Sequence, residues 1–109
     1  MYNSGDIVLI PVPFSDLSSS KKRPVLVISN NSYNTAKPDM IVVAITSNVS
    51  QQGISISSSD MTTGQLPKPS VIRSDKVYTL DQKIVIKSIG QLSSSIVMSA
   101  KNELIKFIS

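Results

Sequence analysis

The chain has 109 residues, a net charge of +4 and a pI near 9.5, and it contains neither cysteine nor histidine. The missing residue types exclude disulfides, thiolate or imidazole metal sites and the usual general base of enzymes. An apolar content of 40% is typical of a folded domain, and no apolar run is long enough for a membrane span or a signal peptide, so we expect one cytoplasmic domain over residues 1–109.

The first half of the chain predicts three strands separated by polar loops. The first strand covers 6–14, and its prolines at 11 and 13 predict that its far half is an edge or a bend. A continuous apolar run over 24–29 predicts a second strand, buried on both faces, and another run over 40–47 predicts a third. Loops are expected at 15–20 and at 30–38.

The second half of the chain is expected to change from strands to a helix. Residues 48–69 form a long polar segment, expected to be functional or partly mobile, with a short half-exposed strand at 54–57. Strands are predicted at 70–78 and 84–86, with a turn at 79–82. The last segment predicts an amphipathic helix with Ser93 or Ser94 as its N-cap. Its apolar positions are Val97, Ala100, Leu104 and Phe107 or Ile108, with Lys101, Asn102 and Lys106 on the other side.

This order of elements predicts a mainly β (α+β) fold. Several strands followed by one terminal helix suit a small, strongly twisted antiparallel β-barrel with the helix covering it. No internal repeat or second domain is visible in the sequence.

Cations gather in front of the second strand. Lys21, Lys22 and Arg23 end against Pro24, whereas residues 1–20 carry only two charged side chains, both acidic. A basic cluster favours a polyanionic partner such as nucleic acid, and Arg23 is expected where a basic loop enters a rigid strand. The alternative is a solvated charge cluster that caps the strand.

Hydroxyl groups close the third strand. If the second and third strands are antiparallel neighbours, Arg23 and Thr46 come to the same edge of the sheet, with Ser47 following. A guanidinium fork beside hydroxyls suits a phosphate. The alternative is a turn in which Thr46 and Ser47 satisfy backbone groups.

A second candidate pair lies on the strand at 70–78. Arg73 and Asp75 are two residues apart, so both side chains point to one face; the alternative is an ordinary surface ion pair. The scattered carboxylates predict no metal site, and no glycine-rich loop or aromatic platform for nucleotides is visible. The residues therefore indicate chemistry on a phosphate without metal or cofactor.

Seven segments carry a resemblance that covers nearly the whole chain. In order they are GDIV (5–8), PFSDL (13–17), KRPVLVIS (22–29), IVVAITS (41–47), KPSVIR (68–73), TLD (79–81) and IGQLS (89–93). With this order and spacing the chain resembles the MazF/PemK family of toxins from bacterial type II toxin–antitoxin systems. The resemblance implies an SH3-like barrel with a C-terminal helix that acts as a homodimer and is inhibited by a cognate antitoxin, a small acidic protein.

The resemblance also implies an activity and the residues that carry it. Such toxins are endoribonucleases that cut single-stranded RNA, mainly mRNA, at short motifs without a metal, through attack of the ribose 2′-OH that leaves a 2′,3′-cyclic phosphate and a 5′-OH. Arg23, Thr46 and Asp75 match the catalytic positions. Residues expected to bind RNA are Ser19, Lys21, Lys22, Ser47 and Arg73. The family's first-loop histidine is absent, which leaves Asp75 or Arg23 to accept the proton of the 2′-OH.

Two other functions are compatible with the same barrel. A related group of toxins poisons DNA gyrase without nuclease activity, but that function would not need Arg23 and Thr46 at one edge. A plain SH3-like interaction module would need an aromatic-lined groove, and the chain has five aromatic residues in all.

Overall fold

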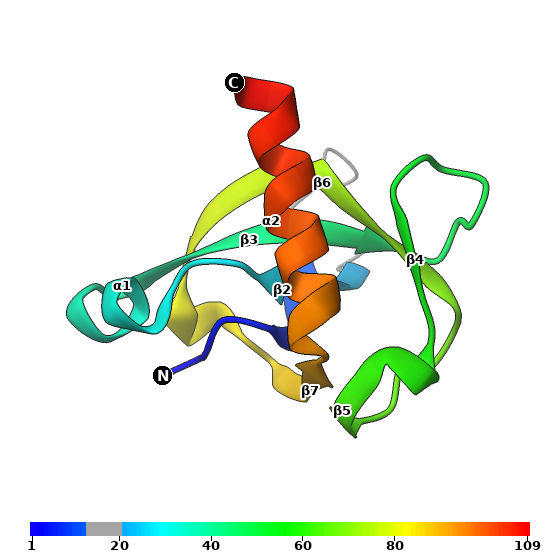
Figure 1. The fold of residues 1–109 in the computed structure, drawn as a ribbon. Coiled ribbons are helices and arrows are strands. Elements are labelled where there is room, and N and C mark those ends of the chain that lie inside the picture. Colours follow the sequence, from blue (N-terminus) through cyan, green and yellow to red (C-terminus); the bar gives the residue numbers. More distant parts are fainter. Residues whose placement is uncertain (13–20) are drawn as a thin grey trace.

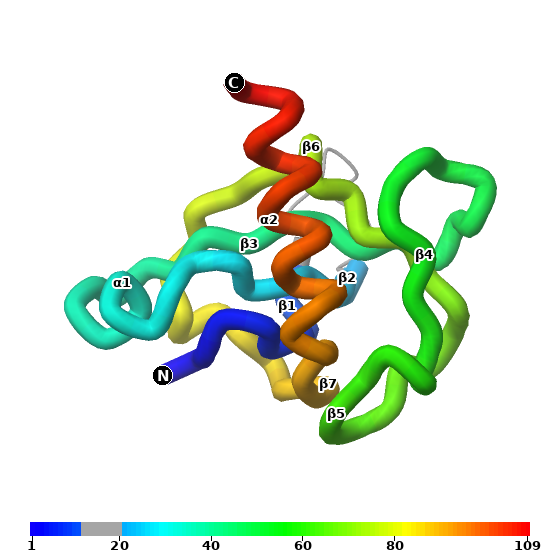
Figure 2. Tube along the Cα trace, viewed as in Figure 1, coloured from blue at the N-terminus to red at the C-terminus, as the bar shows by residue number. Residues whose placement is uncertain are grey.

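The computed structural model describes residues 1–12 and 21–109, and Figures 1 and 2 show the course of the chain. The described residues form one antiparallel sheet of seven strands in the order β4-β6-β3-β2-β1-β7-β5. The strands are β1 (Asp6–Val12), β2 (Lys21–Val27), β3 (Asp39–Thr46), β4 (Ile54–Ile56), β5 (Met61–Gly64), β6 (Ser70–Asp81) and β7 (Lys87–Leu92). The α-helices are α1 (Asn31–Ala36) and α2 (Ser94–Ile108), and short 3₁₀ turns are η1 (Ser58–Asp60) and η2 (Gln82–Ile84).

The sheet curls into a half-barrel, and α2 lies across its inner face (Figure 1). This is the predicted mainly β architecture with a C-terminal helix. No helix of the described residues is long and apolar enough to cross a membrane.

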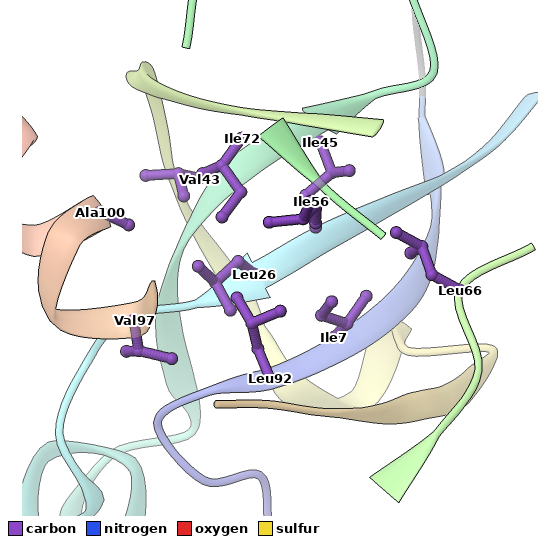
Figure 3. Close-up of a cluster of buried hydrophobic side chains, with 10 residues drawn as sticks. All are labelled: Ile7, Leu26, Val43, Ile45, Ile56, Leu66, Ile72, Leu92, Val97 and Ala100. Carbon is purple, nitrogen blue, oxygen red and sulfur yellow. The ribbon is translucent and has the colours of Figure 1, made fainter. Parts of the chain in front are cut away.

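Both faces of the sheet are buried at its centre. In β2, Leu26 belongs to the inner cluster, whereas Val25 and Val27 belong to the outer one, as the alternation of side chains along a strand requires. All three are at most 3% exposed, which confirms the prediction of a strand buried on both faces. The inner cluster, shown in Figure 3, consists of Ile7, Leu26, Val43, Ile45, Ile56, Leu66, Ile72, Leu92, Val97 and Ala100.

The predicted edge in the first strand is confirmed. Strand β1 pairs with β2 as far as Val12, but with β7 only from Asp6 to Leu9. Within residues 1–12 and 21–109, the far half of β1 therefore has β2 as its one strand partner, and this is the half that holds Pro11. The rest of that predicted strand and the loop at 15–20 lie outside the described residues.

The fourth predicted strand is longer than expected, and the turn predicted at 79–82 is wrong. β6 continues to Asp81 because Thr79, Leu80 and Asp81 pair with Ile41, Met40 and Asp39 of β3.

The strand predicted at 84–86 is also wrong. Ile84 ends η2, and Ile84 and Val85 pack against the outer cluster, so their apolar character reflects burial. The strand follows as β7, which pairs with β1 and β5.

A short helix replaces the loop predicted at 30–38. Asn30 caps α1 by accepting a hydrogen bond of 2.8 Å from the backbone N–H of Tyr33. Asn34 then points into the molecule, where it is 2% exposed, and donates from Nδ2 to the backbone carbonyls of Tyr2 (3.0 Å) and Ser29 (3.1 Å). This helix is held by one buried amide rather than by an apolar stripe, which explains why periodicity did not predict it.

The polar segment at 48–69 contains the short strand expected there, β4, and a second one, β5, which the sequence analysis did not predict. β5 pairs with β7, where Gly64 lies opposite Gly90. Gly64 has a φ of 74°, and a Cβ on it would lie 2.1 Å from the carbonyl oxygen of Ile89. Only glycine permits this approach, so the pairing depends on a feature that hydrophobic periodicity does not report.

The C-terminal helix starts where it was predicted, with Ser93 at the N-cap position. Val97 and Ala100 are buried against the inner cluster, as expected. The apolar stripe continues beyond the sheet, however, because Phe107 is 56% and Ile108 74% exposed. Lys101, expected on the outer side, is half-buried and donates from Nζ to the Ser4 hydroxyl at 2.9 Å.

Candidate active site

Strands β2 and β3 are antiparallel neighbours, which was the condition for the expected meeting of Arg23 and Thr46. Their register pairs Val25 with Ala44. The pairing ends there, and because the two strands are antiparallel, Arg23 and Thr46, each two residues further along its strand, lie toward the same end of the sheet. The condition is met, while the close approach of Arg23 and Thr46 and their catalytic roles stay predictions.

A third side chain joins these two from β6. Ala44 pairs with Arg73 on its other side, so Arg73 shares the sheet face of Ala44. Thr46 lies two residues beyond Ala44 and shares that face as well. Three neighbouring strands thus bring Arg23, Thr46 and Arg73 to the same face and the same end of the sheet.

A register shift sits at this point of β6. Ala44 pairs with Arg73, but the preceding Val43 pairs with Val77, so residues 74–76 have no partner in β3. Such a bulge bends a strand and redirects its side chains, and bulges are frequent beside active sites. Here it follows directly after Arg73 and contains Asp75.

Arg73 and Asp75 form a bidentate pair. Nε of Arg73 donates to Oδ1 of Asp75 at 3.0 Å, and Nη2 donates to Oδ2 at 2.8 Å. The hydrogen bond from Arg73 holds the pKa of Asp75 below its ordinary value, and the same bond raises the pKa of Arg73. Among residues 1–12 and 21–109 this is the one ion pair. The predicted pairing on one face is therefore confirmed.

Gln51 is a member of the site that no pattern in the sequence predicts. Its Oε1 accepts a hydrogen bond of 2.5 Å from Nη1 of Arg73. The polar segment at 48–69 was expected to be functional or partly mobile, but nothing in its composition distinguishes Gln51 from its neighbours. A glutamine four residues after the strand-end hydroxyl of Ser47 is too weak a signal for a contact that spans 22 residues of sequence.

The turn that follows β3 connects Thr46 to Gln51. The Thr46 hydroxyl oxygen accepts from the N–H of Asn48 at 3.1 Å, and the Asn48 carbonyl accepts from the N–H of Gln51 at 3.1 Å. The alternative prediction, a turn that satisfies backbone groups, is thus also correct. It does not compete with a site, because a hydroxyl that accepts one bond keeps its own hydrogen to donate.

The cations at 21–23 lie differently from the prediction. They were expected in a loop entering the strand, but β2 already begins at Lys21, and Arg23, Lys22 and Lys21 pair with Ile10, Pro11 and Val12 of β1. Side chains alternate along a strand, so Lys21 shares the face of Arg23 and Lys22 points to the other. Both lysines are exposed, and Arg23 is half-buried. Ser19 lies outside the described residues.

The arrangement is suited to hold an anion. Two guanidinium groups and a hydroxyl share one end of the sheet, and Asp75 neutralises only part of the positive charge. In the described part of the chain no group of three His, Cys, Asp or Glu side chains could hold a metal ion. A pocket of about 350 Å³ between the N-terminus, β5, β7 and α2 contains none of the predicted site residues.

Comparison with known proteins decides the family. The family described as PemK-like, MazF-like toxin of type II toxin–antitoxin system matches residues 3–108. The chain belongs to this family. Its predicted membership in a family of toxin endoribonucleases is confirmed by the curated Endoribonuclease MazF of Staphylococcus epidermidis, which is 30% identical over 106 residues and covers 95% of this chain and 88% of the relative.

Solved structures confirm the fold. MazF from Deinococcus radiodurans superposes with a TM-score of 0.74 at 17% identity over 98% of this chain and 96% of that one. A mycobacterial endoribonuclease in complex with its cognate antitoxin gives a TM-score of 0.69 at 20% identity over 97% and 90%. Because the sequence identities are this low, the superpositions show a shared fold, the half-barrel with its C-terminal helix.

Proposed function

We propose that this chain is the toxin of a type II toxin–antitoxin system and a metal-independent endoribonuclease that cuts single-stranded RNA, mainly mRNA, at short sequence motifs. Family membership supports the class of protein. The observation that carries the chemistry is the strand register, which brings Arg23, Thr46 and Arg73 to one face at one end of the sheet.

The proposed reaction is an in-line displacement within the RNA. The ribose 2′-oxygen forms a bond to the adjacent phosphorus while the bond to the 5′-oxygen breaks, which leaves a 2′,3′-cyclic phosphate and a 5′-OH. Negative charge develops on the non-bridging oxygens, and Arg23 stabilises it with charge-assisted hydrogen bonds. The Thr46 hydroxyl donates a hydrogen bond to the same phosphate. Ser47, at the beginning of the turn, also binds this phosphate.

Asp75 acts in this scheme by positioning Arg73. Both of its oxygens accept from Arg73, and its lowered pKa makes it a weak base. Arg23, the other expected acceptor, is a poor base because a guanidinium stays protonated. We therefore assign to solvent water both the acceptance of the 2′-OH proton and the donation of a proton to the departing 5′-oxygen, and we assign the catalysis mainly to electrostatic stabilisation by the two arginines.

The surroundings of the site support a polyanionic substrate. Lys21 extends the positive charge on the face of Arg23, and Lys22 and the proposed RNA-binding residue Ser19 flank it in sequence. Phosphate contacts of this kind make RNA binding weaker as salt is raised.

The proposed partners are a second copy of the chain and a cognate antitoxin, in the cytoplasm, where mRNA is found. The last turns of α2 expose Ile105, Phe107 and Ile108, which suits an interface between copies. Solved relatives include MazE–MazF of Deinococcus radiodurans and the mycobacterial endoribonuclease with its antitoxin.

Incubation with a defined single-stranded RNA in EDTA tests this function. We expect cuts at a short motif, with 2′,3′-cyclic phosphate and 5′-OH ends, and a loss of about 100-fold or more in rate for Arg23→Ala. Lys37→Ala removes a cation outside the site and should cut like the parent. Inactivity of the parent in EDTA together with inhibition of gyrase supercoiling would favour the gyrase-poison alternative.

A further inference from the structure

The guanidinium of Arg73 is held at three of its five N–H groups. Asp75 accepts from Nε at 3.0 Å and from Nη2 at 2.8 Å, and Gln51 accepts from Nη1 at 2.5 Å. A guanidinium has one hydrogen on Nε and two on each Nη, so one N–H remains on each Nη. These two N–H groups, together the free N–H pair, are the donors that remain to Arg73 for a phosphate.

Asp75 alone does not determine where this pair points. A carboxylate bound side-on leaves the guanidinium free to move together with it, because both residues belong to the same strand, β6, and Asp75 lies in its bulge. Gln51 comes from a different part of the chain, the turn after β3, and contacts the opposite nitrogen of the fork. Two anchors from two elements restrict the plane and the tilt of the guanidinium together.

Gln51 is itself held by the turn. Its backbone N–H donates to the Asn48 carbonyl at 3.1 Å, and Oδ1 of Asn48 accepts from the hydroxyl (2.6 Å) and the N–H (3.1 Å) of Ser50. Asn48 in turn donates its N–H to the Thr46 hydroxyl oxygen at 3.1 Å. The turn therefore connects the hydroxyl expected at the phosphate with the side chain that holds Arg73.

We propose that Gln51 is a positioning residue for the RNA-cleaving site: through Arg73 it aligns the free N–H pair with the phosphate held at Arg23 and Thr46. This inference rests on the proposed ribonuclease function. The amide can serve in one orientation only, since a guanidinium donates and never accepts, so Oε1 must face Arg73 and the NH₂ group must face away. Bound RNA excludes water from the contact and strengthens it, which compensates for its exposure in the free protein.

Three substitutions separate this role from a merely structural one. Gln51→Ala removes the acceptor of Arg73. Gln51→Asn keeps an acceptor on a shorter side chain, and Gln51→Glu keeps an acceptor on a side chain of the same length. We expect kcat to fall about tenfold in the first two with KM within about twofold, because alignment matters most in the transition state. Gln51→Glu should keep kcat within about threefold and raise KM, since its charge repels the RNA.

The matched control is Gln52→Ala, the same change at the next exposed side chain, which should leave both constants unchanged. All four variants should unfold at the same temperature as the parent. A parental kcat in Gln51→Ala, or a kcat in Gln51→Glu as low as in Gln51→Ala, would overturn the proposal.

A second readout distinguishes failure of this inference from failure of the proposed function. In the parent, NMR should show separate, slowly exchanging Nη resonances of Arg73, and in Gln51→Ala these should broaden or merge while the Nε resonance, held by Asp75, persists. If no RNA is cut by the parent, the ribonuclease proposal fails, and the NMR comparison still decides whether Gln51 positions Arg73. Identical Arg73 spectra in the two proteins would contradict the positioning role.

Discussion

Two polar networks in this molecule have opposite designs. One lies where α1 meets the sheet: Asn34 and Ser29 are buried and Gln82 is partly buried. All three are neutral, and most of their hydrogen bonds go to backbone groups. The other lies at the opposite end of β3, where Arg73 and Asp75 are charged and, with Gln51, bond one side chain to another. The side chains of the first network satisfy backbone groups that have no backbone partner there. The second network keeps charge and hydrogen-bond donors available at the surface.

The difference teaches which network serves stability and which serves function. A buried amide that loses its partners leaves unsatisfied groups in a low dielectric, which costs folding free energy. An exposed ion pair contributes little to stability because water competes for it. We therefore expect substitutions in the first network to change unfolding but not the rate per folded molecule, and the reverse in the second.

The largest expected effect on stability is that of Asn34→Ala. It removes the Asn34 Nδ2 donor from the carbonyls of Tyr2 and Ser29, and it leaves the Ser29 hydroxyl with only the longer contact of 3.4 Å to the Ile41 carbonyl. The free energy of unfolding should fall by about 2–3 kcal/mol, measured by urea denaturation. Asn102→Ala, on the exposed side of α2, is the matched control. The comparison fails if Asn34→Ala alters kcat of the folded fraction without altering stability.

Asp75→Asn should have the opposite signature. The amide keeps one acceptor for Arg73 but loses the charge, so cutting should slow about tenfold while the unfolding midpoint stays within error. Single-turnover cleavage beside thermal unfolding checks both halves of this expectation. A fall of many orders of magnitude in the cleavage rate would instead indicate that Asp75 accepts the proton of the 2′-OH directly.

The pH dependence of cutting sharpens the same assignment. Because Arg73 lowers the pKa of Asp75, the carboxylate stays ionised through the neutral and mildly acidic range, and the pair is lost only when pH falls through that lowered pKa. Asp75 should therefore produce no step in the pH–rate profile between about pH 5 and 8, as its direction of shift requires. A step in this range that disappears in Asp75→Asn would contradict the positioning role.

The smallest effect is expected at Ser74, which lies between the two charged residues but belongs to neither network. It is 1% exposed, and its hydroxyl has no hydrogen-bond partner among the described residues. Ser74→Ala should raise the free energy of unfolding by up to about 1 kcal/mol, since it removes an unsatisfied buried group. Urea denaturation against the exposed Ser88→Ala measures this change. A clear loss of stability would show that the hydroxyl has a partner after all.

Local errors in the expected elements have a common physical cause. Val25 to Val27 and Met40 to Ile45 were recognised as strands because their apolar runs are long. The end of β6 at 79–81 and the apolar pair Ile84 and Val85 were misassigned because strand pairing and burial depend on what lies beside a segment. The strand that pairs with 79–81 and the cluster that buries Ile84 and Val85 both come from distant parts of the sequence, so a local pattern does not show them.

The sequence by itself determined the family, the central strands, the terminal helix and the expectation that Arg23 and Thr46 meet. These rest on ordered motifs and on periodicity, which act over a few residues. Only the tertiary structure decided that Lys22 points away from Arg23, that Asn34 builds a helix, and that Gln51 reaches Arg73 across 22 residues. Each of these depends on the register between strands or on a contact between distant segments, because a polar side chain shows its partner only after the chain has folded.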